Sequence, residues 1–352
     1  WVTAYRVDGF RFDLASILGR NEDGSPMEKP PLLQQLAFDP ILGDVKLIAE
    51  AWDAGGLYQV GKFPSWNRWA EWNGRYRDDI RRYLKGDEGT AGAAALRIAG
   101  SSDIYDPSVR DNASVNFITC HDGFTLYDLY SYNVKHNESN GWNNTDGSND
   151  NHSWNCGAEG ETEDKAVNTL RRRMIRNACA VLMCSRGIPM FLAGDEFGNT
   201  QFGNNNPYCH DDEVSWLDWG LLEKNQDIFR FFKSMIHFRK EHPVLRSNVS
   251  NGFGGLPDIS FHGTRPWAMG FSGSDRYIGV MMAGQEEGKQ PEAVYIASNA
   301  YWEQLEAVLP KLPDGMEWFR AVNTWDAQVS ESGPVGSGFT IPPRTVMVFC
   351  GR

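Results

Sequence analysis

Short apolar runs alternate with longer helical segments along the first two thirds of the chain. The runs are rich in β-branched and aromatic residues, and Gly, Asp or Asn lies at or close beyond their ends, as is typical of strands. Two intervening segments carry apolar residues at a spacing of three or four, which predicts helices over 164–186 and 229–241. The predicted strands span 5–12, 45–52, 114–120 and 188–193. Such alternation indicates a parallel sheet or barrel.

The pattern changes after Pro243. Helical periodicity ends there, and short strand-like runs follow, separated by Gly, Pro and Asp, which indicates a small antiparallel β domain. These runs span 267–271, 277–282, 292–298 and 344–349. We therefore expect an α/β fold in two domains, a barrel-like part over 1–245 and a β domain over 246–352.

Composition and charge narrow the function classes. The 352 residues include 34 Lys and Arg against 46 Asp and Glu, a net charge of −12, which argues against binding to nucleic acid or to an anionic membrane surface. No apolar run approaches the roughly 20 residues of a transmembrane helix. The six cysteines lack the spacing of metal ligands or disulfides, so we expect reduced thiols. The first residues already read as the interior of a domain, which we interpret as a fragment of a longer protein.

Three of the predicted strands end at or near a carboxylate. Asp13 and Glu50 close the first two strands, and Asp122 follows the third. Arg11 shares a strand face with Asp13, and such a neighbour favours the ionised carboxylate that a nucleophile needs. Glu50 follows a fully apolar run, a setting that raises the pKa of a carboxyl and suits a general acid. In a barrel, these strand ends form the catalytic rim.

Other interpretations of these residues stay open when each is taken singly. Arg11 and Asp13 would also fit a structural ion pair, and His121 would fit a core histidine with its hydrogen bonds satisfied. The carboxylates would also suit a Ca²⁺ or Mg²⁺ site, which is the main rival. Taken together, three rim carboxylates with an Arg, a His and no phosphate loop favour glycoside chemistry.

Tryptophans near these strands support sugar binding, because flat aromatic faces suit pyranose rings. The chain has 13 Trp, and those beside the carboxylate-bearing segments are Trp52, Trp66, Trp69, Trp72, Trp142 and Trp154. For any single Trp, simple packing against a barrel explains the residue equally well. The long polar loop over 133–160 is rich in Asn, Gly and Trp, and a loop of this size is more often a functional wall than slack chain.

Longer stretches resemble the α-amylase superfamily, glycoside hydrolase family 13, and within it the isoamylase and glycogen-debranching enzymes. The resemblance rests first on three motifs that carry the carboxylates: VDGFRFD at 7–13, IAEAWD at 48–53 and FITCHD at 117–122. Further matching stretches lie at 61–79, 123–137, 151–156 and 194–219, the last with Gly203-Asn204-Asn205-Asn206. The match extends to about Leu245 and is more specific than any single motif.

The resemblance implies a retaining glycoside hydrolase that cleaves α-1,6 branch linkages of amylopectin or glycogen. It implies that Asp13 is the nucleophile and Glu50 the general acid/base. Asp122 would be the third carboxylate, which distorts the sugar and stabilises the transition state. Arg11 would hold Asp13, and His121 would hydrogen-bond the glucose whose bond is cleaved.

Three further residues complete the substrate-binding set that we expect, namely Trp52, Asp53 and Trp66. No metal and no organic cofactor is implied. The implied partner is an α-glucan such as amylopectin, glycogen or limit dextrin, and homo- or hetero-oligomers with other debranching subunits stay open. The implied compartment is the plastid stroma, with the bacterial cytoplasm as the alternative.

The resemblance also implies a (β/α)8 TIM barrel, of which this chain would hold strands 4–8, followed by a C-terminal antiparallel β-sandwich. A barrel without three of its strands has open edges, so we expect the chain alone to be poorly stable or inactive. Two rival functions remain: another hydrolase or transferase of the same superfamily, and a non-catalytic glucan-binding subunit. The presence of all three carboxylates disfavours the second.

Overall fold

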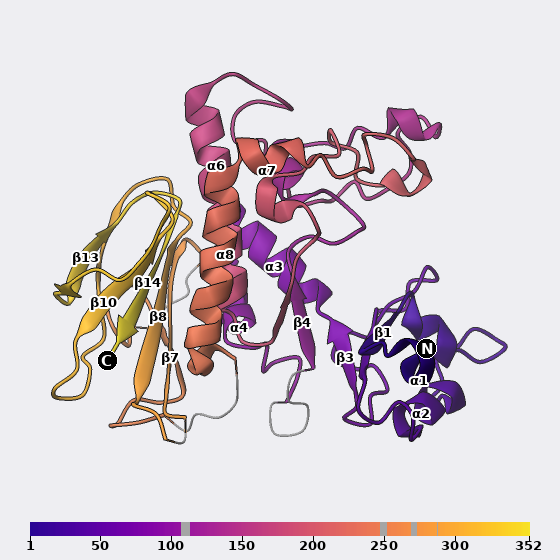
Figure 1. The fold of residues 1–352 in the computed structure, drawn as a ribbon, viewed down its shortest axis with the longest axis horizontal. Coiled ribbons are helices and arrows are strands. Elements are labelled where there is room, and N and C mark those ends of the chain that lie inside the picture. Colours follow the sequence, from indigo (N-terminus) through magenta and orange to yellow (C-terminus); the bar gives the residue numbers. More distant parts are fainter. Residues whose placement is uncertain (107–112, 247–251, 269–272, 287) are drawn as a thin grey trace.

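The molecule consists of three layers, with helices standing between two sheets (Figure 1). The computed structural model describes all residues except 107–112, 247–251, 269–272 and 287. The helices α6 (Lys165–Cys184) and α8 (Gln226–Glu241) lie between a parallel sheet near the N-terminus and an antiparallel sheet near the C-terminus. The chain is therefore of mixed α/β type, as the sequence pattern predicts.

The parallel sheet follows the order of the chain. Its five strands are arranged β1-β2-β3-β4-β5, and every neighbouring pair is parallel. The strands are β1 (Gly9–Phe12), β2 (Lys46–Ala49), β3 (Trp69–Trp72), β4 (Ser114–Phe117) and β5 (Ile188–Met190). Parallel neighbours need a long crossover, and the segments between these strands supply one each time.

Four of these strands are predicted by the sequence pattern, and each is shorter than expected. The run at 5–12 forms a strand only from Gly9, because α1 (Val2–Tyr5) is a helical turn after which Arg6 has a left-handed φ of 54°. The strand β3 is missed. Its segment contains Glu71, which looks exposed in the sequence but is buried and accepts a hydrogen bond from the N–H of Gly61 at 2.6 Å.

Both predicted long helices are confirmed. The helix α6 begins after Asp164, whose side chain accepts hydrogen bonds from the N–H groups of Ala166 and Val167. The helices α3 (Gly74–Lys85) and α4 (Ala91–Ile98) were not predicted, because the strongly charged α3 segment hides a buried apolar face. The shorter helices are α2 (Pro31–Phe38), α5 (Leu126–Leu129), α7 (Gly220–Lys224), η1 (Ala15–Gly19), η2 (Glu138–Asn140), η3 (Asp195–Phe197), η4 (Pro207–Cys209) and η5 (Pro243–Leu245).

The C-terminal part forms antiparallel sheets. The larger has the strand order β11-β10-β14-β8-β7-β6, with β12 also paired to β10, and β13 pairs with β9 in a small second sheet. The strands are β6 (Ile259–His262), β7 (Tyr277–Gly284), β8 (Glu292–Asn299), β9 (Leu305–Val308), β10 (Trp318–Asn323), β11 (Gln328–Val329), β12 (Pro334–Val335), β13 (Gly338–Ile341) and β14 (Thr345–Gly351).

One predicted strand in this part is wrong as far as the structure describes it. The run at 267–271 begins in a turn, where Trp267 has a φ of 63° and donates its N–H to Nδ1 of His262 at 3.0 Å. The residues 269–271 lie outside the described part of the chain. A positive φ is incompatible with a strand, and the strand of this region is β6 instead.

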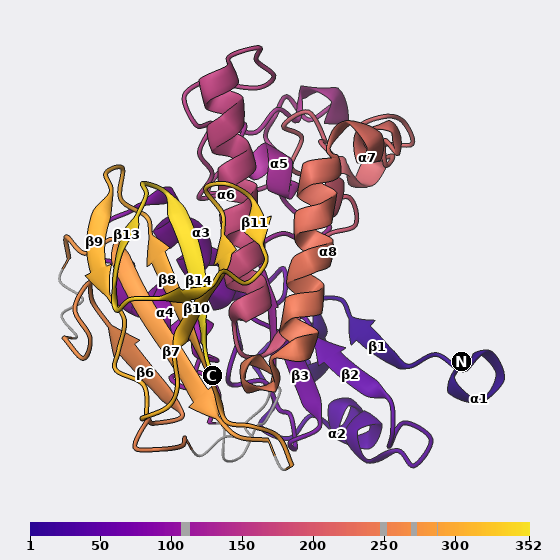
Figure 2. The ribbon, with the colours of Figure 1, turned by 60° about the vertical axis from the view of Figure 1, so that its left-hand side comes forward.

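The two faces of the large antiparallel sheet pack against different partners, as Figure 2 also shows. Val280 of β7 belongs to the core that joins this sheet to α3, α4, α6 and α8. Its neighbour Met281 points to the opposite face and packs with Ala307 of β9 and Ile341 of β13. The helix layer and the sheet therefore share one apolar core across the expected domain boundary at 245.

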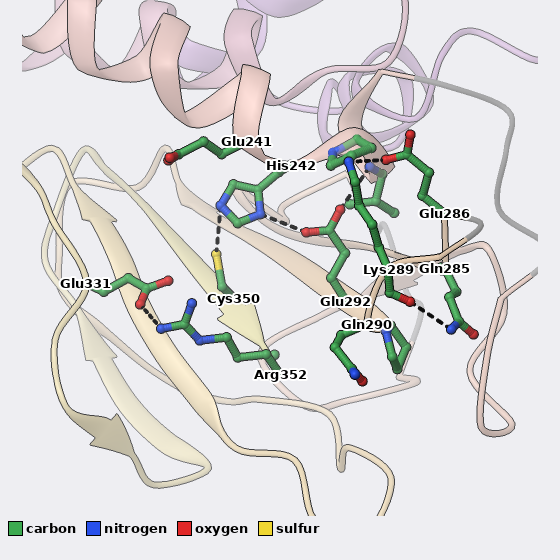
Figure 3. Close-up of a pocket in the computed structure, with 15 residues that line it drawn as sticks. Glu241, His242, Gln285, Glu286, Lys289, Gln290, Glu292, Glu331, Cys350 and Arg352 are labelled. Atoms are coloured by element: carbon green, nitrogen blue, oxygen red, sulfur yellow. Dashed lines mark hydrogen bonds and ion pairs between the residues drawn. The ribbon is translucent and has the colours of Figure 1, made fainter.

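His242 joins the end of α8 to the antiparallel sheet (Figure 3). Its Nδ1 lies 2.8 Å from Oε2 of Glu292, and its Nε2 lies 3.8 Å from Sγ of Cys350. The other carboxylate oxygen of Glu292 accepts the N–H of Val244 at 3.1 Å. A pocket of about 380 Å³ opens beside these side chains.

Among the helices that the structure describes, none combines the length and the apolar character needed to cross a membrane.

Candidate active site

Asp13 and Glu50 leave neighbouring strands at the same level. The register of β1 and β2 pairs Phe12 with Ala49, so the next residue of each strand is a carboxylate. The N–H of Glu50 donates to the carbonyl oxygen of Phe12 at 3.1 Å, which continues the ladder to the edge of the site. The two side chains therefore leave the parallel sheet side by side at the same end of their strands.

Arg11 is the cation common to both carboxylates. Its Nη1 lies 2.6 Å from Oδ1 of Asp13, and its Nη2 lies 2.8 Å from Oε1 of Glu50, the second as an ion pair without hydrogen-bond alignment. The guanidinium also lies 4.0 Å from the ring centre of Trp72 at the end of β3. One cation held over an aromatic ring thus offsets the repulsion between two close carboxylates.

The two carboxylates differ sharply in exposure. The side chain of Glu50 is 3% exposed, whereas that of Asp13 is 66% exposed. Burial raises the pKa of Glu50, the N–H of Leu14 at 2.7 Å and the charge of Arg11 oppose this, and the charges of Asp13 and Asp122 add to it. A buried carboxyl that favours its protonated form can donate a proton, and an open carboxylate beside it can attack a sugar carbon.

Asp122 and His121 approach from the far side of β3. Both side chains are exposed, and Nε2 of His121 lies 3.6 Å from Oδ1 of Asp122. The ring of His121 meets the ring of Trp72 edge to face, with 5.8 Å between the ring centres. The ring of Trp72 also lies beside the guanidinium of Arg11. Trp72 therefore connects the segment of His121 and Asp122 to the pair of Asp13 and Glu50.

The remaining predicted binding residues have other neighbours. Both carboxylate oxygens of Asp53 pair with Arg20, at 2.6 and 2.9 Å, and this pairing lowers the pKa of Asp53 to about 2. Trp66 packs edge to face on Phe38 of α2, with 6.4 Å between the ring centres. These contacts link separate segments of the chain, and direct sugar contact by Asp53 and Trp66 stays a prediction.

A pocket of about 280 Å³ lies between the segment after β2 and Arg77 of α3. Trp52 and Tyr58 line it with their rings stacked at 6.0 Å and an angle of 10°, and Asp53 and Arg77 also border it. Contact of Trp52 with a glucan stays a prediction. Tyr58 was missed, because its partner is recognised only once the loop after β2 folds back on itself.

Trp72 is the central residue for which the sequence analysis gave no individual role. Trp72 lies at the end of β3, a strand that the sequence pattern does not predict. Among the residues that the structure describes, no group of three or more His, Cys, Asp or Glu could hold a metal ion.

Curated relatives match nearly the whole chain. It is 46% identical to isoamylase 3, chloroplastic, of Oryza sativa subsp. japonica over 344 residues, which cover 97% of this chain and 43% of that protein. It is 42% identical to a glycogen operon protein GlgX homolog of Mycobacterium tuberculosis over 384 residues, covering 99% of this chain and 51% of that protein. The chain thus spans about half the length of these relatives or less.

Solved structures agree in fold. A pullulanase from Bacillus acidopullulyticus aligns with a TM-score of 0.70 at 20% identity and covers 99% of this chain and 38% of its own. A type I pullulanase from Bacillus subtilis str. 168, complexed with maltose, gives a TM-score of 0.70 at 19% identity, covering 99% and 44%. A comparison with protein-family models finds no match. On these identities and this fold, the chain belongs to the isoamylase and GlgX group of glycoside hydrolase family 13.

Proposed function

We propose that this chain carries the catalytic carboxylates of a retaining glycoside hydrolase that cleaves the α-1,6 branch linkages of amylopectin or glycogen. The observation that carries the proposal is the pairing of exposed Asp13 and buried Glu50 through Arg11 at adjacent strand ends. The shared guanidinium brings the two carboxylates together at one edge of the sheet, where one can act as nucleophile and the other as acid. The isoamylase and GlgX relatives support the branch linkage as the bond attacked.

In the proposed reaction, Asp13 attacks the anomeric carbon while Glu50 gives its proton to the leaving glycosidic oxygen. The bond between that carbon and the oxygen breaks, and a covalent glycosyl-enzyme forms on Asp13. Glu50, now ionised, takes a proton from water, which attacks the same carbon and releases Asp13. Asp122 and His121 hold the distorted sugar, and Arg11 keeps the two reacting carboxylates in place.

The finer description of the fold is part of the same proposal. We assign β1 to β5 to strands 4–8 of a (β/α)8 barrel within 1–245, and the antiparallel sheets to a C-terminal β-sandwich within 246–352. The parallel order of five strands and the two sheets that face each other across Met281 support this assignment. The apolar core that crosses residue 245 means that the two parts stabilise each other.

The proposed substrate partner of this protein is an α-glucan. Its proposed protein partners, in an oligomer, are other debranching subunits. Relatives named chloroplastic isoamylases support the plastid stroma as the compartment, and the mycobacterial GlgX homologues support a bacterial cytoplasm. Trp52, Asp53 and Trp66 remain proposed contacts for the glucan beyond the cleaved bond.

The decisive experiment compares the parent protein with a Glu50→Gln variant on amylopectin. Both are made as an extended protein, in which this chain follows the upstream segment of rice isoamylase 3 that the resemblance implies. The released linear chains are sized, and glucan binding is measured separately. We expect chain release by the parent, a loss of on the order of 10³-fold or more in the variant, and unchanged binding.

Two other results would redirect the assignment. Binding without release by a folded parent would support the glucan-binding subunit. Release of short α-1,4 products alone would support another hydrolase of the superfamily.

A further inference from the structure

Buried asparagines hold the long loop over 133–160. The loop has little secondary structure of its own, only the short η2. An amide side chain carries both donors and an acceptor, so a pair of them can satisfy each other without a buried charge. Four asparagines that are at most 5% exposed lie where this loop meets the segment after η3: Asn137, Asn151, Asn204 and Asn205.

Asn205 is the centre of this network. Its N–H donates to Oδ1 of Asn137 at 2.9 Å, and its Oδ1 accepts from Nδ2 of the same residue at 2.9 Å. Its Nδ2 donates to Oδ1 of Asn151 at 2.9 Å and to the carbonyl oxygen of Ser148 at 2.7 Å. One side chain therefore fixes two separate points of the loop.

The backbone of Asn205 reaches the turn that carries the third carboxylate. Its carbonyl oxygen accepts the N–H of Gly123, the residue after Asp122, at 3.0 Å. Nε2 of Gln201 donates to the carbonyl oxygen of Gly123 at 3.3 Å, so the same segment holds both ends of this residue. Gly123 has a φ of +94°, which lets the chain turn sharply after Asp122.

A second set of contacts, made by Arg81, connects the loop to the segment just after β4. Arg81 of α3, 5% exposed, donates Nε to the carbonyl oxygen of Ile118 at 2.8 Å and Nη1 to that of Asn151 at 3.1 Å. Burial lowers the pKa of Arg81 to about 10, a value at which the side chain stays charged at neutral pH. The loop is thus tied on one side to the strand before Asp122 and on the other to the turn after it.

We propose that Asn205 is a positioning residue that sets the 133–160 loop and the Asp122 turn as one unit. This inference rests on the proposed function, because it gives Asp122 a role in turnover. A glucan branch that lies against the loop is then aligned with the third carboxylate without a separate closing motion. Asn205 acts on Asp122 through the backbone of Gly123.

The test uses Asn205→Asp and Asn137→Asp in the extended protein. Each replaces an amide NH₂ with an oxygen that faces existing acceptors, and each adds a buried charge. Asn143→Asp is the matched control, since it adds the same charge in the same loop at an exposed residue outside the network. Amide hydrogen exchange is followed at Gly123, in the loop and in α6, and kcat and KM are measured on amylopectin.

We expect the Gly123 amide to exchange at least about tenfold faster in both network variants, with α6 and the control unchanged. We expect kcat to fall on the order of 10- to 100-fold, with KM within about twofold, because misplacement of Asp122 weakens the transition state more than substrate binding. The control should keep the kinetics of the parent.

The inference is overturned if Gly123 exchanges at the same rate in the network variants and in the control. It is equally overturned if protection is lost throughout α6, since the network would then hold the whole fold rather than the turn. A parent that releases no linear chains would remove the proposed function, while the exchange at Gly123 would still decide whether Asn205 couples loop and turn.

Discussion

At the scale of single residues, the guanidinium of Arg11 lies between the carboxylates of Asp13 and Glu50. Arg11 lies within 2.8 Å of both Asp13 and Glu50, yet burial raises the pKa of Glu50 against its influence. Because Glu50 is buried and Asp13 is exposed, two similar carboxyl groups can take different roles, one as acid and one as nucleophile. The charge of Arg11 and the desolvation of Glu50 are therefore the two quantities that mutation can change separately.

We expect Arg11→Met to raise the pKa of Glu50 further, because the neutralised residue no longer opposes desolvation. Since Glu50 must be protonated to act as an acid, the alkaline limb of the kcat/KM profile should move to higher pH. The value of kcat itself should fall on the order of 100-fold, because the carboxylates lose their common anchor. The pH profile of an Arg75→Met control, which changes an exposed charge on α3, should stay in place.

Asp195 is a second carboxyl governed by burial. It accepts hydrogen bonds from the Thr119 hydroxyl and from the N–H groups of Leu126 and Leu192, yet desolvation raises its pKa to about 7. The folded state therefore favours the proton. The contribution of Asp195 to the free energy of unfolding is fully present below pH 3.8, where the carboxyl is protonated in both states. It is lost as the pH rises to about 7 and the buried carboxyl ionises.

We expect Asp195→Asn to flatten the pH dependence of the free energy of unfolding, because a side-chain amide does not ionise in this pH range. Urea midpoints of the parent should fall between pH 4 and pH 7 by more than those of the variant, as the window of the shift dictates. Parallel curves for the two proteins across this window would contradict the raised pKa.

Contacts between elements decide which helix faces are buried. The ring of Phe232 on α8 meets the ring of Phe191, just after β5, at 5.2 Å and an angle of 63°, and Phe232 is 2% exposed. This contact ties the helix layer to the edge of the parallel sheet. On the other side, α6 and α8 pack on the antiparallel sheet through the common core.

We expect Phe232→Ala to lower the free energy of unfolding of the extended protein by about 3–5 kcal/mol, because it removes a buried ring and leaves a cavity. Lys233→Ala, one residue further along and exposed, should change it by less than about 0.5 kcal/mol. Urea unfolding of both variants measures the difference. Equal effects would show that α8 is not packed as the structure describes.

At the scale of the whole molecule, the parallel sheet is open at both of its edges. Of the described strands, β1 pairs with β2 alone and β5 with β4 alone, so each outer strand presents an unpaired edge. Unpaired parallel edges favour association over folding.

We expect the 352-residue chain by itself to lack both a cooperative thermal transition and hydrolytic activity, in contrast to the extended protein. Calorimetry and chain release measure this, and native activity with a sharp transition in the chain alone would contradict it.

Much of the architecture was predictable because periodicity reports which face of an element is buried. It predicted α6, α8 and four of the five parallel strands, and the motifs around Asp13, Glu50 and Asp122 indicated the candidate site. The strand β3 and the helix α3 were missed for one reason. Their segments contain Glu71 and Arg81, which are polar in the sequence but are buried and hydrogen-bonded to backbone groups in the structure.

The sequence by itself determined the family, four of the five parallel strands, the two long helices, and which carboxylates are available for chemistry. Only the tertiary structure decided that Arg11 pairs with both Asp13 and Glu50, that Trp72 links them to His121, and that Asn205 ties the loop to Gly123. Periodicity is local, because it depends on neighbours along one element. Except for Arg11 and Asp13, these contacts join residues far apart along the chain, as Arg11 to Glu50 and Gly123 to Asn205 do, and they exist only once the chain has folded.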